Sequence, residues 1–331
     1  MTIKTYVSCW LLLAAFLVPC AFGADFKVAL VLDKGGRDDK SFNSAAVRGA
    51  TKAKDELKGL SLKIVEATDD NAFESLLRSF AQRDFDLIIS VGVSQADAVK
   101  KVSARFSNKH FVIVDAVVEA PNVQSLIFQE HEGSFLVGAI AGTMTKTGKI
   151  GFIGGMDIPL IRRFELGYGA GAKHVNPKAK LISNFVGVTS DAWNNPAKAK
   201  ELAVSQYGQG ADIVFAAAGA SNSGLFDAAE EQKKFAIGVD SNQNWIKPGY
   251  ILTSMLKRID KAVFDACSDD LKGGFNGGVK RFGLADQGVD FSVDEHNETI
   301  LPREVRARAE KLKAEIVSGK IKVPDYYQKK K

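Results

Sequence analysis

The sequence predicts an α/β protein with two similar lobes, each a doubly wound parallel sheet, joined by a hinge. Three observations predict this class: a length of 331 residues, an alternation of apolar runs with helical segments, and one internal repeat of that alternation. At roughly 100–200 residues per domain, the length suits two lobes. Hydrophobic residues are 46% and charged residues 25% of the chain, a globular balance that argues against long disorder and a polytopic membrane protein.

The charge argues against nucleic acid as a partner. The net charge of +5 is modest for this length, and the basic residues are spread out apart from Lys329–Lys331. Because no basic stripe interleaved with aromatic residues is present, we expect no nucleic-acid partner.

The first 23 residues are expected to be a secretory signal peptide. Lys4 precedes an apolar run from Val7 to Val18, which is shorter than the roughly 20 apolar residues of a membrane span. The small residues Ala21 and Gly23 favour cleavage before Ala24. The mature protein is therefore expected to be exported.

Two alternatives to cleavage at this point stay open. Leu17–Cys20 partly matches a bacterial lipoprotein box, although Pro19 stands where a small residue is expected, and an uncleaved membrane anchor is the other alternative. Cleavage would remove Cys9 and Cys20 and leave Cys267, so no intramolecular disulfide is expected. We interpret Cys267 as a small buried apolar residue.

Strand-like and helix-like segments alternate through the first half. Phe26–Leu32 is an apolar run that ends at Asp33–Gly36, and an apolar face at helical spacing follows from Ala46 to Leu57. Continuous apolar runs separated by helices indicate a parallel sheet covered on both faces. The further runs are Leu62–Val65, Leu87–Val91, Phe111–Val114 and Leu126–Phe128.

The second half repeats this order at nearly constant spacing. Lys149–Gly155 corresponds to Lys27–Asp33, and the common order of several weak matches indicates two similar lobes. The other matches pair Phe42 and Gly49-Ala50 with Phe164 and Gly171-Ala172, Asp86–Ile89 with Asp212–Phe215, and Val114-Asp115 with Val239-Asp240.

The lobes are expected to exchange chain segments. We place a helix at 131–146 as the first passage between them, and return passages near Thr253–Arg258 and Asp286–Asp290, which would form the hinge. The predicted units are a signal peptide at 1–23, an N-terminal lobe at 24–131 with about 256–285, and a C-terminal lobe at 132–255 with about 286–331.

A cleft between the lobes is the predicted ligand site. Ligands of open parallel sheets bind beyond the carboxyl ends of the strands, and two facing lobes would line a cleft with those ends. In this chain the ends carry Asp33, Gly92, Asp115, Gly154-Gly155, Ala218-Gly219 and Asp240.

The turn from Asp33 to Asn43 lacks the spacing of phosphate-binding loops, so it does not favour a nucleotide. Ser41 or Asn43 is expected to cap the helix that follows. Phe42 is a large apolar residue at a polar loop tip. It is either a staple that packs under the loop or an exposed plate on which a planar ligand stacks.

The second lobe places Trp193 in a comparable polar loop, just before a helix that begins near Pro196. Trp193 is either structural or, together with Phe42 across the cleft, one side of a sandwich around a flat ring. Asp115 and Asp240 end strands at equivalent places. They could serve as general acid and base, accept hydrogen bonds from a hydroxylated or amine-bearing ligand, or cap the next turn.

Binding without chemistry fits the sequence better than catalysis. His110, His131, His174 and His296 lack metal-ligand spacing, and no nucleophile–base motif is present. We therefore predict no enzyme, no metal and no cofactor. Lys257 follows a strand and either enters the cleft or is an ordinary exposed lysine.

At Gly35–Asn43 the sequence resembles the basic membrane protein family of transport receptors, which includes purine nucleoside receptors of ABC importers. The resemblance covers nearly the whole mature chain, in order. It continues through Phe111–Asp115, Asn122–Phe128, Glu132–Ala139, Gly154–Met156, Gly210–Ile213, Ala218-Gly219, Gly238–Gln243 and Ser254–Lys257.

This resemblance implies a type I periplasmic-binding-protein fold that closes over its ligand, and a periplasmic receptor, expected to be a monomer, that serves an ABC permease of the inner membrane. The purine nucleoside receptors of the family stack the base between two aromatic rings and hold the polar edges and ribose with acids and a lysine. Asn195 departs from the Asp usual there, and Pro19 disfavours the lipid-anchor cysteine. The implied ligand-binding residues are Asp33, Ser41, Phe42, Asn43, Asp115, Trp193, Gly219, Asp240 and Lys257.

Four hypotheses therefore stand. The first is a receptor for a purine nucleoside. The second is the same receptor for riboflavin, another heterocycle or a sugar. The third is a soluble nucleoside-processing enzyme. The fourth, a ligand-responsive transcription regulator, would need a DNA-binding module at the N-terminus, where the signal peptide lies instead.

Overall fold

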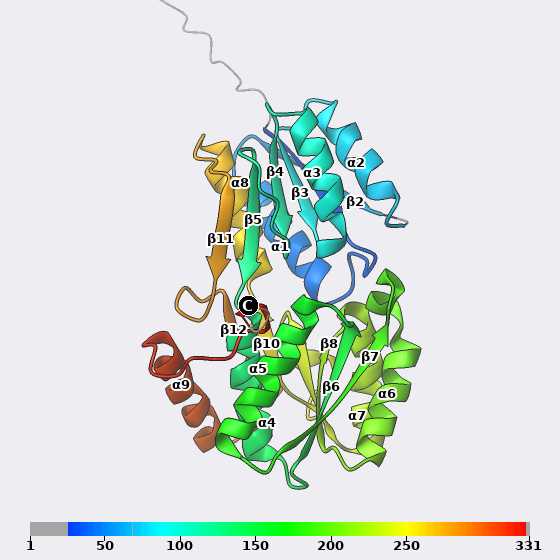
Figure 1. Ribbon diagram of the computed structural model, residues 1–331, viewed down its shortest axis with the longest axis vertical. Coiled ribbons are helices and arrows are strands. Elements are labelled where there is room, and N and C mark those ends of the chain that lie inside the picture. The colour runs from blue at the N-terminus through cyan, green and yellow to red at the C-terminus, as the bar shows by residue number, and fades with distance from the viewer. Residues whose placement is uncertain (1–25, 68, 329–331) are drawn as a thin grey trace, which may run out of the picture.

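The computed structural model describes residues 26–67 and 69–328, which form two α/β lobes placed end to end (Figure 1). The expected signal peptide, with Cys9 and Cys20, lies outside the described residues. Within them, no helix is long and apolar enough to cross a membrane. Cys267 is buried, which raises the pKa of its thiol to about 12, as suits a packing residue.

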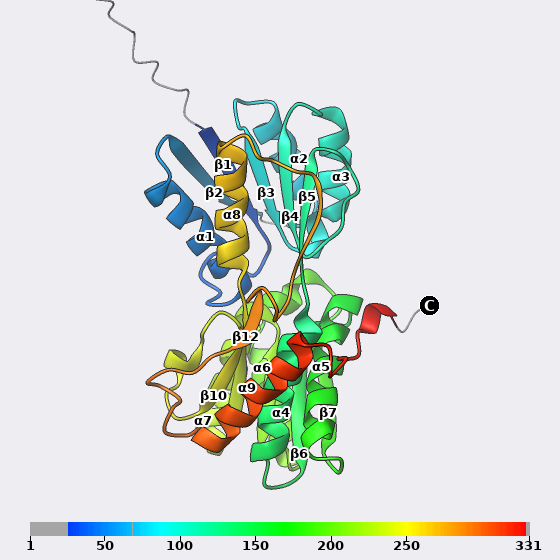
Figure 2. The ribbon, with the colours of Figure 1, turned by 90° about the vertical axis from the view of Figure 1, so that its left-hand side faces the viewer.

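The N-terminal lobe contains a parallel sheet in the order β11-β5-β4-β3-β1-β2. Helices α1 and α8 pack together on one face, and α2 and α3 on the other (Figures 1 and 2). The strands are β1 Phe26–Leu32, β2 Leu60–Glu66, β3 Leu87–Val91, β4 His110–Val114, β5 Val123–Phe128 and β11 Gly278–Phe282. The helices are α1 Phe42–Glu56, α2 Ala72–Ala81, α3 Ala96–Arg105 and α8 Ile259–Leu271, with a short 3₁₀ turn, η1, at Val93–Gln95.

Strand β1 shows why this run of apolar residues becomes a central strand. Val28 and Leu30 share a cluster with Ala46 of α1, whereas Ala29 belongs to a cluster with Phe73 of α2. Successive side chains of a strand point to opposite faces, so a strand covered on both faces needs apolar residues at every position. The sequence-based expectation of a doubly covered parallel sheet is confirmed.

The C-terminal lobe repeats the plan in the order β12-β10-β9-β8-β6-β7. Only β12, at the edge, runs antiparallel to its neighbour β10, an edge strand that the apolar pattern did not predict. The strands are β6 Lys149–Met156, β7 Lys180–Gly187, β8 Ile213–Ala217, β9 Phe235–Asp240, β10 Ile251–Lys257 and β12 Val289–Phe291. The helices are α4 Glu130–Met144, α5 Pro159–Val175, α6 Pro196–Gly208, α7 Asn222–Gln232 and α9 Arg303–Val317, with 3₁₀ turns η2 Ser190–Asn194, η3 Gly219–Ser221, η4 Asn244–Ile246 and η5 Tyr326–Gln328.

Paired glycines explain part of the sequence repeat. A Cβ at Gly49 of α1 would lie 2.2 Å from the carbonyl oxygen of Asp260 in α8, and one at Gly171 of α5 would lie 1.9 Å from that of Phe135 in α4. Glycine weakens an isolated helix, but here its missing side chain lets two helix backbones approach. The two matched glycines therefore mark equivalent helix–helix contacts in the two lobes.

Three crossing segments connect the lobes within the described residues (Figure 2). They are 128–130 between β5 and α4, 257–259 between β10 and α8, and 282–289 between β11 and β12, and we call them together the hinge. The Gln129 amide donates to the carbonyl oxygen of Phe282 at 2.8 Å, and the Arg258 amide to that of Gly288 at 2.9 Å. Because backbone hydrogen bonds join the segments, the hinge acts as one structural unit.

Candidate functional site

One cavity of about 580 Å³, including its open part, lies between the lobes and is lined by both. We call it the interlobe cavity. Most of the residues singled out from the sequence meet there, and Ser41 lies behind the lining. Those on the lining are Asp33, Phe42, Asn43, Asp115, Trp193, Gly219, Asp240 and Lys257.

The sheets explain this convergence. Asp33 directly follows β1 and Asp115 directly follows β4, while Asp240 and Lys257 are the last residues of β9 and β10. All four stand at carboxyl ends of parallel strands, where side chains from different strands meet at one edge of a sheet. Gly219 begins η3 just after β8 with a φ of +60°, a backbone conformation that glycine adopts without strain.

Asp115 and Asp240 share an unusual backbone conformation. Their φ angles are +71° and +64°, in the left-handed region that few residues other than glycine enter. Aspartate tolerates this region better than most residues because its short side chain hydrogen-bonds locally. Such conformations are costly and cluster at functional sites, so the two strand ends are candidates for ligand contacts.

Asp115 is half satisfied. Its Oδ2 accepts a hydrogen bond from Nζ of Lys257 at 2.5 Å, but its buried Oδ1 has no hydrogen-bond partner among the described residues. Burial raises the pKa of the Asp115 carboxyl above its ordinary value of 3.8, and the attraction of Lys257 opposes this rise. An unpartnered buried acceptor is costly, and a ligand hydroxyl or N–H entering the interlobe cavity would satisfy it.

Asp240 has a different anchor. Its Oδ2 accepts a hydrogen bond at 2.6 Å from the hydroxyl of Ser41, which belongs to the opposite lobe. Burial raises the pKa of Asp240 to about 6, while Lys257 and the Ser41 hydroxyl oppose the rise. Ser41 is thus placed to orient Asp240 rather than to touch the contents of the cavity.

Asp33 and Asn43 form a rigid corner of the lining. The Asn43 amide oxygen accepts from the backbone N–H of Asp33 at 3.1 Å, and Asn43 Nδ2 donates to the Asp33 carbonyl oxygen at 3.4 Å. Burial raises the pKa of the Asp33 carboxyl to about 6, although the Lys34 amide donates to it. Asn43 therefore fixes the direction in which Asp33 leaves β1.

The cap of α1 differs from the expectation. Neither Ser41 nor Asn43 caps the helix with its side chain. Asp39 does so instead: its carboxylate accepts the backbone N–H groups of Ser41, Asn43 and Ser44 at 2.8–3.0 Å. A carboxylate at a helix N-terminus also complements the helix dipole. This arrangement leaves the hydroxyl of Ser41 free to reach Asp240.

Aromatic rings enter the cavity from both lobes. Phe42 comes from α1, and Phe164 and Trp193 come from α5 and η2 of the other lobe. Phe42 lines the cavity and also packs partly against the core. Trp193 lies over Gly155, where a Cβ would be 2.1 Å from its ring. The sequence repeat already paired Phe164 with Phe42 and could have identified it.

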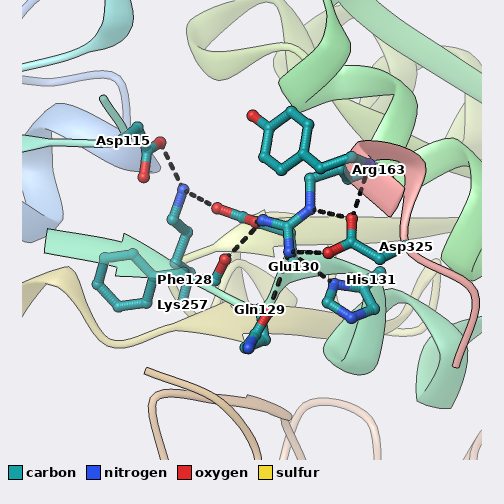
Figure 3. A network of polar contacts seen from close by, with 9 residues as sticks. Asp115, Phe128, Gln129, Glu130, His131, Arg163, Lys257 and Asp325 are labelled. Atoms are coloured by element: carbon teal, nitrogen blue, oxygen red, sulfur yellow. Dashed lines mark hydrogen bonds and ion pairs between the residues drawn. The ribbon is translucent and has the colours of Figure 1, made fainter. Parts of the chain in front are cut away.

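A buried chain of charges leads from the cavity into the hinge (Figure 3). Lys257 Nζ lies 2.5 Å from Asp115 and 3.2 Å from Glu130, and Glu130 in turn accepts from Arg163 at 2.5 Å. Arg163 also donates to Asp325 at 2.7 Å. Sequence reasoning missed Glu130, Arg163 and Asp325, because no local pattern places α5 or the C-terminal segment beside the hinge.

His131 takes part in this network as a neutral acceptor. Its Nδ1 lies 2.9 Å from Nη2 of Arg163, and burial together with the Arg163 charge lowers the pKa of His131 to about 4. Within residues 26–67 and 69–328, no group of three His, Cys, Asp or Glu side chains could hold a metal ion.

Direct polar contacts also join the two lobes outside the lining of the cavity. Lys34 pairs with Asp191 at 3.0 Å, and Arg48 donates to the Ser241 hydroxyl at 2.8 Å.

Asn195 caps α6 by accepting the Lys198 amide at 3.0 Å. Since Asn and Asp cap helices about equally well, the departure at Asn195 preserves that local role.

Comparison with known sequences gives a consistent result. A family model described as ABC transporter substrate-binding protein, PnrA-like, matches residues 26–326. A CD4+ T-cell-stimulating antigen of Listeria innocua is 37% identical, over 91% of this chain and 88% of that protein. The ABC transporter nucleoside-binding protein BmpA of Lactococcus lactis is 34% identical, over 91% of this chain and 89% of that protein.

Solved structures agree. A solute-binding protein of an ABC transporter system from Aeropyrum pernix has a TM-score of 0.83 at 30% identity, with 90% of this chain and 94% of that chain covered. AraP, an arabinose-binding protein from Geobacillus stearothermophilus, has a TM-score of 0.62 at 15% identity, with 84% and 99% covered. At that identity the second likeness concerns the fold alone, which is that of periplasmic solute-binding proteins.

Proposed function

The chain belongs to the PnrA-like family of ABC transporter substrate-binding proteins, and from this premise we propose that it captures a purine nucleoside in the interlobe cavity and delivers it to an ABC permease. The family and its structural neighbours are solute-binding proteins, not enzymes. The name of the Lactococcus lactis relative, a nucleoside-binding protein, supports this ligand class.

The charge of the cavity lining carries the proposal. Four carboxylates, Asp33, Asp39, Asp115 and Asp240, face a single cation, Lys257, which is already paired with Asp115 and Glu130. A phosphorylated ligand would meet repulsion in such a lining. A neutral ligand that donates hydroxyl and N–H groups would satisfy the carboxylates, and hydrogen bonds to charged groups contribute about 1.5–3 kcal/mol each.

The aromatic residues of the cavity offer surfaces on which the base of a nucleoside could stack. We assign the faces of the base to Phe42 and Trp193, one from each lobe, and stacking contributes roughly 1–3 kcal/mol per base. Asp240 and Asp33 are assigned to the ribose hydroxyls, Asp115 Oδ1 and Lys257 to polar edges of the ligand, and Gly219 to a backbone contact. The lobes would open for ligand entry and close around it.

Export and delivery follow from the same role. We propose that the signal peptide directs the protein to the periplasm, where it acts as a soluble monomer. An acyl chain on Cys20 would instead tether it to the membrane, and the intact mass of the mature protein separates the two: cleavage before Ala24 removes Cys20 altogether.

Mass spectrometry of ligand that co-purifies with the mature protein tests the proposal. We expect a purine nucleoside in stoichiometric amount. Riboflavin or another heterocycle would keep the receptor and change its ligand, and a sugar would make the rings a sugar platform. Turnover of inosine by the purified protein would move the function to the third hypothesis, in which Asp115 or Asp240 serves as acid or base.

A further inference from the structure

Lys257 is held from two sides by carboxylates that play different parts. Asp115 lines the interlobe cavity, whereas Glu130 lies behind it, fully buried at the start of α4. Nζ of Lys257 lies 2.5 Å from Asp115 Oδ2 and 3.2 Å from Glu130 Oε1 (Figure 3). Asp115 accepts a hydrogen bond from this ammonium, whereas Glu130 Oε1 attracts it as an ion pair without a hydrogen bond. The two carboxylates therefore set the position of Nζ, and the ammonium keeps N–H donors for a ligand.

The surroundings of Lys257 keep its ammonium charged. Burial lowers the pKa of Lys257, but the attraction of Asp115, Glu130 and Asp240 outweighs burial and raises it above its ordinary value of 10.5. The other neighbours are rings: Nζ lies 5.2 Å from the ring centre of Phe42, with Phe128 and Phe164 at similar distances. Tyr327 of η5 is the further titratable group that senses this charge.

Glu130 is fixed by Arg163 in turn. The guanidinium is 2% exposed and donates from Nη1 to Glu130 Oε2 and to the carbonyl oxygen of Phe128 at 2.8 Å. Its Nη2 contacts Gln129 Oε1 at 3.0 Å and His131 Nδ1. Arg163 therefore contacts four consecutive residues, 128–131, which form the first crossing segment and the start of α4.

The C-terminal segment locks this arginine. Asp325 accepts from Nε of Arg163 at 2.7 Å and from Nη2 at 3.0 Å, and the Tyr327 ring lies 4.6 Å from the guanidinium carbon. Burial alone would raise the pKa of Asp325, but the bonds from Arg163 hold it below its ordinary value of 3.8. A two-point bond to a planar guanidinium fixes orientation as well as distance.

We propose that Glu130 is a positioning residue of the ligand site, which aims the Lys257 ammonium into the interlobe cavity, and that Arg163 and Asp325 hold Glu130 in place. The C-terminal segment thereby governs ligand affinity from outside the cavity. This inference rests on the proposed function, because it concerns the same site.

The chain of contacts from Asp325 through Arg163 and Glu130 to Lys257, which we call the relay, also joins the ligand to the hinge. Glu130 ends the first crossing segment and Lys257 begins the second, so their ion pair ties two of the three segments together. A ligand that engages Lys257 therefore acts on the contact that spans these segments.

The neighbouring arginine of α5 offers a control. Arg162 is bound by Asp157 and Glu165 at 2.6 Å near the surface.

Calorimetric titration of inosine into Glu130→Gln, Arg163→Lys and Asp325→Asn tests the proposal, with Arg162→Lys and Glu165→Gln as controls. We expect Glu130→Gln to weaken binding by about 10- to 100-fold, as partners that orient metal ligands do. Asp325→Asn, at the far end of the relay, should lose a few-fold, and the controls should bind as wild type. The double variant Glu130→Gln/Arg163→Lys should be no weaker than Glu130→Gln alone.

Titration of lysines labelled at Cε, followed by NMR without ligand, gives the readout that a purely structural role would not move. The Lys257 signal, assigned through Lys257→Arg, should titrate at lower pH in Glu130→Gln than in wild type. If Glu130→Gln does not fold, Asp325→Asn carries the test, and affinity equal to that of Glu165→Gln would overturn the proposal. An unchanged Lys257 titration and unchanged affinity in Glu130→Gln would overturn it as well. If wild type binds no nucleoside, the proposed function fails, while the Lys257 titration still decides the relay.

Discussion

Asp115 and Asp240 occupy the same place in the two lobes and differ in how they are held. Both follow the fourth apolar run of their lobe, with a left-handed backbone, and both are buried. Asp115 is bound by the cation of Lys257, whereas Asp240 is bound by the neutral hydroxyl of Ser41 from the opposite lobe. The repeat thus fixes the geometry of the two carboxylates, and their partners set their chemistry.

The difference separates a permanent contact from a conditional one. Lys257 lies at the hinge, so its pairing with Asp115 depends little on the distance between the lobes. Ser41 reaches Asp240 directly from the opposite lobe, so that bond requires the two lobes to stay close together. We infer that Asp115 stabilises the folded protein, and that Asp240 responds to closure and ligand.

The largest effect is expected from Lys257→Met. The change leaves Asp115 and Glu130 as buried carboxylates without their shared cation, and breaking a buried pair in this way costs about 3–5 kcal/mol. The free energy of unfolding from urea titration should fall by that amount. A loss below about 1 kcal/mol, the value typical of a surface ion pair, would mean that Asp115 does not stabilise the folded protein, and the inferred difference from Asp240 would be wrong.

Phe42→Ala and Trp193→Ala test whether the two lobes contribute equally to stacking. Each should weaken nucleoside binding by about 1–3 kcal/mol, measured by calorimetry, with little change in the melting temperature of the ligand-free protein. If melting collapses while the folded fraction binds normally, the rings are core residues.

Asp240→Asn keeps size and shape and removes one charge. Charge-assisted hydrogen bonds are roughly twice as strong as neutral ones, so binding of inosine should weaken by about 1–3 kcal/mol. Hypoxanthine, which has no ribose, should bind the variant and wild type alike. An equal loss for nucleoside and base would move Asp240 away from the sugar, and no loss for either would make it a turn cap.

A pH series sharpens the electrostatic side of the comparison. The pKa values of Asp33 and Asp240 are raised by burial to about 6, above the ordinary value of 3.8. Their contribution to the stability of the ligand-free protein is therefore fully present below about pH 4 and lost as the pH rises through 6. Ribose hydroxyls favour the ionised carboxylates, so nucleoside affinity should fall by up to about tenfold per pH unit and per group as the pH drops below 6.

The control for the pH series is Asp240→Asn, in which the dependence should become shallower. Affinity that rises toward pH 5 would mean that the ligand accepts hydrogen bonds from protonated carboxyls. In that case Asp33 and Asp240 would act as donors, and the neutral-donor ligand class would be wrong.

Ser41→Ala gives the smallest expected effect. It removes the hydroxyl that orients Asp240 but leaves the carboxylate that the ligand meets, so we expect a loss of about 0.5–1.5 kcal/mol in binding free energy, smaller than that of Asp240→Asn. Nucleoside binding should weaken by that amount while Lys257 and Asp115 keep their contact. A melting temperature that falls without loss of affinity would assign Ser41 to the fold alone.

Much of the fold could be predicted from the sequence, because the spacing of apolar residues and the internal repeat follow directly from how strands and helices pack. Fully apolar strand runs report sheets covered on both faces, and the repeat matched Gly49 with Gly171, which serve equivalent helix contacts. The antiparallel strand β12 was not predicted, since its three residues carry no periodicity of their own.

The site was readable only in part. Asp33, Asp115 and Asp240 could be located because the carboxyl ends of the parallel strands in each sheet face the space between the lobes. Phe164 could have been located through its match to Phe42. Glu130 and Arg163 could not, because their pairing depends on how α4 and α5 pack. The prediction that Ser41 or Asn43 caps α1 was wrong. Asp39 caps the helix by accepting three backbone N–H groups, and aspartate is a residue type that commonly does so.

Calorimetric titration of the mature protein with guanosine, guanine and guanosine monophosphate, side by side at pH 7, tests the central proposal most directly. We expect guanosine to bind most tightly, because its base stacks and its ribose hydroxyls meet carboxylates. Guanine should bind more weakly, and the monophosphate should be rejected by a lining with four carboxylates and one paired cation. Binding of the monophosphate as tight as that of guanosine, or binding of none of the three, would contradict it.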